Sequence, residues 1–212
     1  MFALVHVVIV FLFFYGPMDS TITTGKIIIV TAPSGSGKTT LVKRMLAAYP
    51  TLAFSISACT RKPRPNEEHG RDYYFFTEEE FKRLIDENAF IEWEMVYTGK
   101  YYGTLKTEVE RIWSNGQAPL VDIDVQGALA IERQYPESAL SLFIQAPSME
   151  ELRNRLIKRG TETPETLEER IKKAEWELTH AKYFDAIIIN DDLDKATEEL
   201  INTIKDFPDK TL

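Results

Sequence analysis

The sequence predicts an α/β fold whose central parallel sheet is covered by helices on both faces, and two observations indicate it. Short apolar runs recur along the chain with helical patterns between them, an alternation typical of a parallel sheet. The first run also leads directly into a glycine-containing loop and a further helical pattern, as in P-loop proteins. The four apolar runs lie at Lys26–Thr31, Leu120–Asp124, Ser141–Ile144 and Ala186–Ile189.

The loop after the first run, within IIIVTAPSGSGKTT, predicts a phosphate-binding P-loop in a three-layer, P-loop NTPase-like core. Consecutive backbone N–H groups and the positive end of a helix can surround phosphate oxygens when few Cβ atoms obstruct them. Lys38 is expected at the β- and γ-phosphates, and the Thr39 hydroxyl at Mg²⁺. The alternative is a glycine-rich turn that binds nothing. The predicted loop residues are Ala32, Pro33, Ser34, Gly35, Ser36, Gly37, Lys38, Thr39 and Thr40.

Apolar spacing predicts three helices in the first half of the chain. One follows the loop and stops before Pro50, and a second begins with a capping box formed by Thr77 and Glu80. The third is predicted to run from Thr104 to Asn115 and to end at Gly116.

Composition limits the classes of function. At 212 residues the chain suits one domain or a core with small insertions. The formal charge of −8 argues against a general nucleic-acid binder, which needs a basic surface. Cys59 is the only cysteine, so no disulfide can form within the chain, which fits a reducing compartment or indifference to redox conditions.

The N-terminal segment MFALVHVVIVFLFFYG does not resemble the rest of the sequence. It is shorter than the roughly 20 residues that a membrane-spanning helix needs. A secretory signal would carry a positively charged residue near its start, but no Lys or Arg precedes Lys26. We expect residues 1–24 to be an extension outside the fold, with Met18 as a possible native start. The alternative is an anchor that binds a membrane interface.

Residues 54–104 interrupt the alternation and predict an inserted small lobe. Arg61 and Arg64, followed by Tyr73 and later Tyr102, place planar cations and phenol hydroxyls in this insertion. Such groups suit a phosphate monoester, because an arginine fork binds two oxygens and a tyrosine donates without adding charge. Each piece alone is typical of an ordinary surface turn.

Three carboxylates are further candidates. Glu92 lies between apolar residues on a strand-like run, either facing solvent or accepting paired N–H donors such as those of guanine. Asp122 and Asp124 end a presumed central strand, where open α/β sheets bind ligands. We expect them to orient Mg²⁺, a base or an arginine, although acids at strand ends are also ordinary helix caps.

Residues 153–171 predict a mobile lid. Ser148 and Glu151 form a predicted capping box, and Arg155 and Arg159 lie four residues apart on one helix face. Thr163-Pro164 then starts a helix that carries Arg170. These arginines either form a solvated face or deliver positive charge to a transferring phosphoryl group.

Taken together, these residues resemble the guanylate kinase family, whose members phosphorylate GMP with ATP. The resemblance covers about Gly25 to Phe207. It rests on five motifs in the family's order and spacing: APSGSGKTTL, FSISACTRKPRPNEEHGRDYYF, FIEWEMVYTGKYYGT, LVDIDVQGA and RLIKRGTETPE. Ala32 departs from the glycine usual at that position, and Cys59 from the polar residue common there.

The resemblance implies a role for each motif residue. Ser57, Glu92 and Thr104 would contact guanine, with Asp122 or Asp124 beside them. Arg61, Arg64, Tyr73 and Tyr102 would hold the GMP phosphate, with Gly103 in the same site. Lys38 and Thr39 would act on ATP and Mg²⁺. The residues expected to assist transfer directly are Lys38, Arg61, Arg155, Arg159 and Arg170.

The predicted function is therefore transfer of a phosphoryl group from ATP to GMP or dGMP by direct in-line attack in purine metabolism. The kinase domain is expected at 25–209, in the cytoplasm, with ATP, GMP and Mg²⁺ as its ligands. We expect no nucleic-acid partner, and no membrane association unless the N-terminal extension is real. Two alternatives are a catalytically silent relative that binds proteins, which the Lys38-Thr39 pair disfavours, and a kinase of another phosphate ester, which Glu92 disfavours. The oligomeric state is left open.

Overall fold

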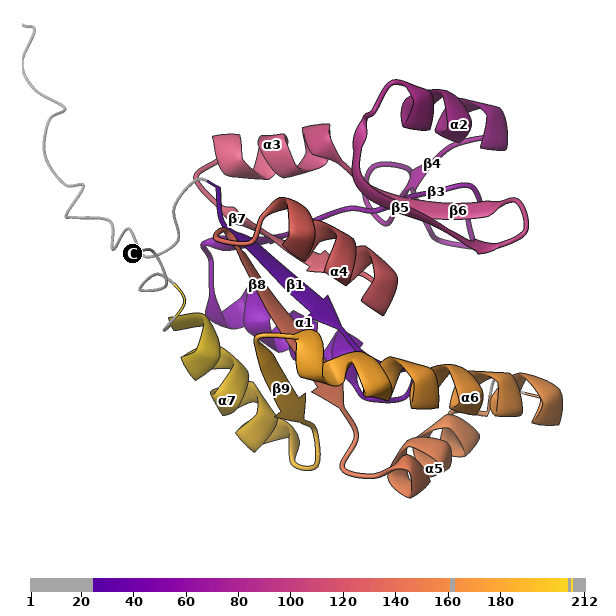
Figure 1. The fold of residues 1–212 in the computed structure, drawn as a ribbon, viewed down its shortest axis with the longest axis vertical. Coiled ribbons are helices and arrows are strands. Elements are labelled where there is room, and N and C mark those ends of the chain that lie inside the picture. Colours follow the sequence, from indigo (N-terminus) through magenta and orange to yellow (C-terminus); the bar gives the residue numbers. More distant parts are fainter. Residues whose placement is uncertain (1–24, 161–162, 206, 208–212) are drawn as a thin grey trace, which may run out of the picture.

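The computed structural model describes residues 25–160, 163–205 and 207. Within them a large parallel sheet lies between layers of helices, and a smaller sheet lies beside it (Figure 1). The predicted extension at 1–24, and residues 161–162 of the predicted lid, fall outside this part of the chain. None of the helices in the described part is long and apolar enough to cross a membrane.

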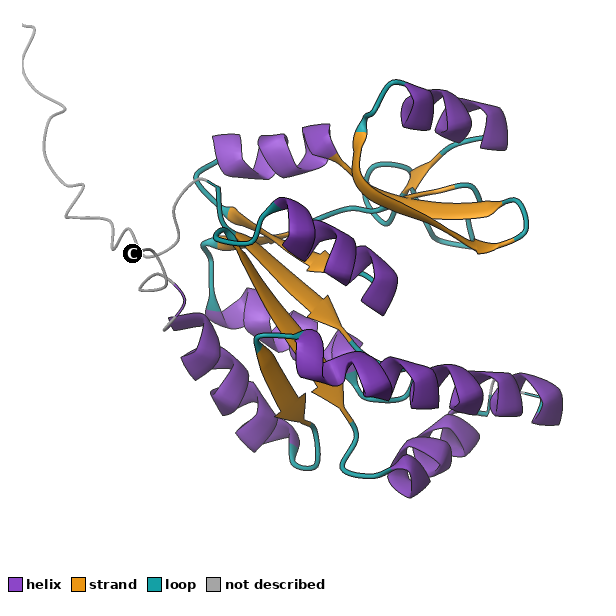
Figure 2. Ribbon diagram, viewed as in Figure 1, coloured by secondary structure: helices purple, strands orange, loops and turns teal. Residues whose placement is uncertain are grey.

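The large sheet contains five parallel strands and confirms the predicted fold class. Its order is β2-β7-β1-β8-β9, with β1 at the centre paired to β7 and β8. Helices cover both of its faces (Figure 2). The strands are β1 (Ile27–Thr31), β2 (Leu52–Phe54), β7 (Ala118–Asp122), β8 (Ala139–Gln145) and β9 (Ala186–Ile189).

Alternation along β1 explains why both faces are apolar. Ile28 and Val30 join the core formed with α1 (Lys38–Ala48) and α7 (Leu193–Lys205). Ile27 and Ile29 join the opposite core, formed with α3 (Lys106–Ser114) and α4 (Val125–Gln134). A strand buried on both faces needs a continuous apolar run, because successive side chains point to opposite sides.

The small sheet has the order β4-β3-β6-β5 and carries α2 (Glu78–Asp86) on its own apolar cluster. In that cluster the rings of Phe81 and Phe90 stack with centroids 4.4 Å apart. The predicted capping box of Thr77 and Glu80 is present at the start of α2. The strands of the small sheet are β3 (Ala58–Cys59), β4 (Tyr74–Phe75), β5 (Phe90–Tyr97) and β6 (Lys100–Leu105).

The helix predicted from Thr104 begins later, at Lys106. Thr104 and Leu105 belong instead to β6, where they pair with Glu92 and Phe90 of β5. Apolar spacing along the chain could not detect this, because the strand is defined by a partner that lies more than ten residues earlier.

Two further helices, α5 (Met149–Arg159) and α6 (Pro164–His180), form a hairpin that extends beyond the carboxyl edge of the large sheet (Figure 1). Leu152, Leu156 and Ile171 pack between them. Ser148 caps α5, but the predicted reciprocal box is absent, since the Glu151 carboxylate pairs with Arg155 at 2.7 Å. The helix α6 starts at Thr163-Pro164 as predicted, with Thr163 as its N-cap, and a short 3-10 helix, η1 (Ala181–Tyr183), leads on to β9.

Candidate active site

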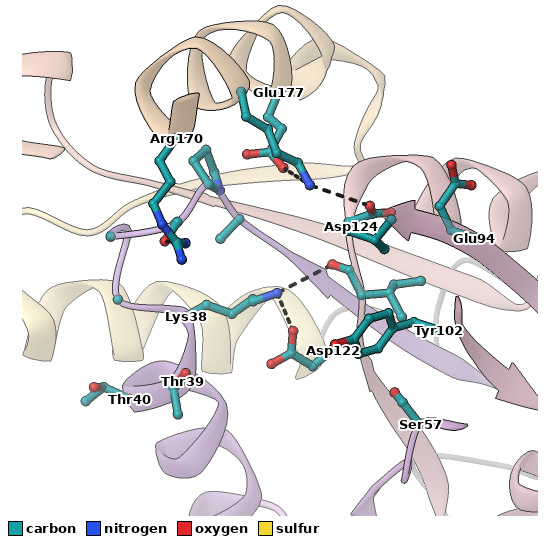
Figure 3. Close-up of a pocket in the computed structure, with 18 of the residues that line it drawn as sticks. Lys38, Thr39, Thr40, Ser57, Glu94, Tyr102, Asp122, Asp124, Arg170 and Glu177 are labelled. Carbon is teal, nitrogen blue, oxygen red and sulfur yellow. Dashed lines mark hydrogen bonds and ion pairs between the residues drawn. The ribbon is translucent and has the colours of Figure 1, made fainter. Parts of the chain in front are cut away.

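A central cleft of about 1180 Å³ lies between the P-loop, the small sheet and the α5/α6 hairpin (Figure 3). It opens at the carboxyl ends of β1 and β7, the edge at which open α/β sheets bind ligands. Of the predicted site residues in the described part of the chain, Ser36, Arg61, Arg64 and Thr104 are outside its lining. The predicted residues that line it are Ala32, Pro33, Ser34, Gly35, Gly37, Lys38, Thr39, Thr40, Ser57, Tyr73, Glu92, Tyr102, Gly103, Asp122, Asp124, Arg155, Arg159 and Arg170.

The P-loop joins β1 to α1 through two glycines with left-handed backbones. Gly35 has φ 94° and Gly37 has φ 89°, a region that other residues rarely occupy. Gly37 is also the N-cap of α1 and offers no side chain to the first turn, so N–H groups there are left for an anion. A Cβ at Gly37 would collide with the Asn190 amide, which donates to the Ser36 carbonyl at 2.8 Å.

Lys38 points from the first turn of α1 toward the end of β7. Its amine forms an ion pair with Asp122 and lies 3.5 Å from the Ile123 carbonyl oxygen (Figure 3). Lys38 and Asp122 each keep 23% of their side chains exposed, so the pair remains open to the cleft. A phosphate entering the loop would compete with Asp122 for this amine.

Asp124 caps a helix and also lines the cleft. The strand predicted through Asp124 ends at Asp122, and Asp124 is the N-cap of α4, accepting from the Gly127 N–H at 3.1 Å. Its other carboxylate oxygen lies 3.9 Å from the Lys173 amine. The helix-cap alternative therefore holds for Asp124, whereas Asp122 pairs with Lys38.

Glu92 is a buried carboxylate at the cleft wall and does not face solvent. It keeps 7% of its surface exposed, and the Thr104 hydroxyl donates to it at 2.6 Å from the paired strand. Burial raises the pKa of Glu92 to about 7, against the lowering effect of the Thr104 hydroxyl. Thr104 thus lies behind Glu92, which explains why Thr104 itself does not line the cleft.

Neither predicted arginine of the small lobe lines the cleft. Arg61 forms two hydrogen bonds to Glu67, at 2.6 and 2.9 Å, and its guanidinium lies 4.6 Å from the Tyr73 ring centroid. The Arg64 backbone N–H donates to the same carboxylate, while its side chain is exposed. Arg61 holds the pKa of Glu67 down at about 2. Glu67, an acid inside a basic turn, was not among the predicted residues.

Three arginines of the α5/α6 hairpin line the wall of the cleft that this hairpin forms. Arg170 donates to the Ser34 hydroxyl of the P-loop at 2.9 Å. Arg155 donates to the Asn190 carbonyl at 3.0 Å as well as pairing with Glu151. Arg159 also lines the cleft. All three predicted lid arginines thus line the cleft, and Arg170 contacts the P-loop itself.

Sequence analysis missed several lining residues on α6. Lys173 lies 3.8 Å from Glu177, which is 5% exposed and whose pKa burial raises to about 7. Both follow Arg170 at helical spacing, three and seven residues later, which is the signal that could have found them. The lining residues that were not predicted are Phe54, Asp72, Glu94, Val96, Ile123, Thr166, Glu169, Lys173 and Glu177.

A P-loop at the carboxyl edge of a five-stranded parallel sheet defines a P-loop nucleotide-binding protein. The sequence model of one family, described as guanylate kinase, matches residues 24–207. This chain belongs to the guanylate kinase family.

Individual relatives agree with that assignment. A guanylate kinase of Bacteroides fragilis is 53% identical over 86% of this chain and 89% of its own length. One of Porphyromonas gingivalis is 49% identical over 86% of this chain and 97% of its own. The crystal structure of guanylate kinase from Anaplasma phagocytophilum superposes with a TM-score of 0.71 at 32% identity, covering 90% of this chain and 89% of that one.

Proposed function

We propose that this protein transfers the γ-phosphoryl group of ATP to GMP, or to dGMP, and releases ADP and GDP or dGDP. Family membership supports the reaction, and one observation in the structure carries the choice of substrates. The P-loop lysine, Lys38, and the buried carboxylate of Glu92 line the same cleft from different lobes. A triphosphate donor and a guanine acceptor would therefore meet between them.

The proposed donor site is the P-loop. Backbone N–H groups of the loop and Lys38 would bind the phosphates, as in other P-loop kinases. Thr39 lines the cleft directly after Lys38, and its hydroxyl oxygen suits Mg²⁺, which prefers oxygen ligands. Mg²⁺ carried in with ATP would add positive charge at the phosphate oxygens.

The proposed acceptor site is the wall formed by the small sheet. Glu92 would accept from guanine N–H groups, with Ser57, Thr104 and the Asp122–Asp124 segment beside it. Tyr73 and Tyr102 already face the cleft, with rings in an edge-on contact 6.3 Å apart. Arg61 would join them when the GMP phosphate replaces Glu67 as its anion, and the exposed side chain of Arg64 would bind the same phosphate.

Transfer would proceed directly, without a covalent enzyme intermediate. An oxygen of the GMP phosphate attacks the γ-phosphorus while the bond from that phosphorus to the β–γ bridging oxygen breaks. The attacking oxygen is already anionic at neutral pH, so no general base is required. Arg155, Arg159 and Arg170 would stabilise the charge on the transferring group, which is the main task in such reactions.

The domain boundaries and location belong to the same proposal. We assign 25–209 to the kinase domain, with the acceptor lobe at about 54–104 and the lid at about 153–171. The small sheet and the α5/α6 hairpin support these two divisions. We place the reaction in the cytoplasm, where its substrates occur and where the buried thiol of Cys59 would stay reduced.

The test is to incubate purified protein with ATP, Mg²⁺ and GMP and to separate the nucleotides by chromatography. We expect ADP and GDP in equal amounts. A folded protein that binds both nucleotides but forms no GDP would contradict the proposal and identify a catalytically silent member of the family.

A further inference from the structure

Glu108 of α3 is a fully buried carboxylate that lies outside the central cleft and that the proposed chemistry does not use. Its side chain is 1% exposed. One oxygen accepts from the Ile56 backbone N–H at 3.0 Å and from Arg111 at 2.8 Å. The other accepts from the Tyr74 hydroxyl at 2.9 Å and from Arg111 at 2.9 Å. Four donors thus fix both oxygens in place.

The helix that carries Glu108 is held to the large sheet. Val109 and Ile112 are buried in α3, and Val109 packs in the same core as Ile27 and Ile29 of β1. The indole N–H of Trp113 donates to the Lys26 carbonyl at 2.9 Å, directly before β1. Glu108 therefore projects from an element whose position is set by the core.

Its two partners outside α3 lead to the cleft wall. Ile56 directly precedes Ser57, and Tyr74 directly follows Tyr73; both Ser57 and Tyr73 line the cleft. The Tyr74 N–H also donates to the Ser57 carbonyl at 2.9 Å, so the two segments hold each other. Glu108 binds both segments, because it accepts from the main-chain N–H of Ile56 in one and from the side-chain hydroxyl of Tyr74 in the other.

We propose that Glu108 is a positioning residue for the acceptor nucleotide, which fixes Ser57 and Tyr73 relative to the core through Ile56 and Tyr74. This inference rests on the proposed function, which assigns Ser57 and Tyr73 to the GMP site. Glu108 does not touch the substrate. Its effect is to keep Ser57 and Tyr73 in a constant position relative to the P-loop.

The electrostatics of the cluster favour this role. Burial by itself raises the pKa of Glu108, but hydrogen bonds from Arg111, the Ile56 N–H and Tyr74 together lower it below its usual value. The carboxylate stays ionised and accepts all four hydrogen bonds at neutral pH. An amide at this position would present N–H groups to one of these donors, and that contact would be lost.

The experiment compares Tyr74→Phe and Glu108→Gln with the wild-type chain, and uses Glu110→Gln as the matched control because Glu110 is exposed on the same helix. The readouts are KM for GMP, KM for ATP, kcat and the melting temperature. The dissociation constant for GMP, measured by calorimetry without ATP, gives a readout independent of turnover. Tyr74→Phe removes a single hydroxyl and keeps the ring, so it tests the idea even if Glu108→Gln fails to fold.

We expect Tyr74→Phe to raise KM and the dissociation constant for GMP about fivefold, the effect of one lost hydrogen bond. Glu108→Gln should raise both further, and the double variant should be less than additive because the two groups share one contact. KM for ATP should stay within about twofold in every variant, and Glu110→Gln should match the wild type.

Two outcomes would overturn the inference while leaving the proposed function intact. One is a lowered melting temperature with an unchanged KM and dissociation constant for GMP, which would make the cluster purely structural. The other is an equal rise of KM for both nucleotides, which would mean a general disturbance. Failure of the wild-type chain to phosphorylate GMP is a separate result, which would overturn the proposed function and the inference that rests on it.

Discussion

At Gly127 the absence of a side chain allows Glu92 to take its position in the cleft wall. A Cβ placed on Gly127 would lie 2.8 Å from a Glu92 carboxylate oxygen, closer than real Cβ contacts. The N–H of the same glycine holds Asp124 at 3.1 Å. One small residue of α4 thus positions two of the groups that we assign to guanine.

We therefore predict that Gly127→Ala raises KM for GMP by about tenfold or more, because Glu92 must move from the place where it pairs with the base. KM for ATP should change little. Steady-state kinetics with each substrate varied in turn would measure both. Gln126→Ala, at an exposed position of the same helix, is the control. An unchanged KM for GMP in Gly127→Ala would show that Glu92 does not need its present position.

The burial of Glu92 also predicts a pH dependence of stability. Its pKa is raised from an ordinary 4.5 to about 7 in the folded chain. Between these values the folded state keeps a proton that the unfolded chain has released, so the free energy of unfolding falls as pH rises and then levels above about pH 7. Glu177 contributes in the same direction.

We predict that Glu92→Gln removes Glu92's share of this fall, which is of the order of 3 kcal/mol at most. Urea unfolding at about pH 5 and about pH 7.5 would measure it as the difference between variant and wild type. Glu110→Gln should leave the fall unchanged. A fall that is equally steep in Glu92→Gln would contradict the raised pKa.

Single residues differ in how far sequence could predict their place. Lys38 and Gly37 belong to a local motif, and their positions follow from the loop itself. The contact of Arg61 with Glu67 could not be predicted in this way. The motif marks Arg61 as a residue that binds substrate, but it does not show which carboxylate Arg61 pairs with when no substrate is bound. Lys173 and Glu177 were missed because their part in the site depends on how α6 packs over the cleft.

Among the elements, α1 combines two functions. Its apolar face, with Leu41 and Met45, packs into the core, while its first turn presents Lys38 and Thr39 to the cleft. The packing of the helix therefore fixes the direction in which its N-terminus points. Removing the Lys38 amine should leave the packed face intact.

We predict that Lys38→Ala lowers kcat by about 10³-fold or more while the protein remains folded, because a positive charge is lost where negative charge shifts during transfer. Circular dichroism would check the fold and a coupled ADP assay the rate. Lys43→Ala, at an exposed position of the same helix, should retain wild-type activity. Turnover within about tenfold of the wild type in folded Lys38→Ala would exclude the P-loop as the donor site.

Element boundaries followed from sequence where the signal was local and failed where it was not. The cap at Thr77 and the start of a helix at Thr163-Pro164 were predicted from nearby residues, and both are present. The start of α3 was predicted two residues early, because the pairing of Thr104 with Glu92 is set by a turn between two strands. The half-formed cap of α5 reflects competition by Arg155 for the Glu151 carboxylate.

For the whole molecule, alternation of apolar runs was enough to predict a parallel sheet, but not its strand order. That order depends on pairs such as Ile28 with Leu120, which are far apart in the chain. The resulting cleft gathers residues from the P-loop, from β5 and β6 of the small sheet, and from α5 and α6 (Figure 3). The proposed binding of two anionic nucleotides in this cleft therefore depends on long-range packing of three separate units.

The central claim is that this cleft accepts guanine in preference to adenine, and the most direct test is the ratio of kcat/KM for GMP to that for AMP. A coupled ADP assay with ATP at a fixed saturating concentration measures both. We expect a ratio of about 10⁴ or more, because adenine lacks the N–H pair and would leave the buried Glu92 without its partners. Phosphorylation of AMP within about tenfold of GMP would contradict the account.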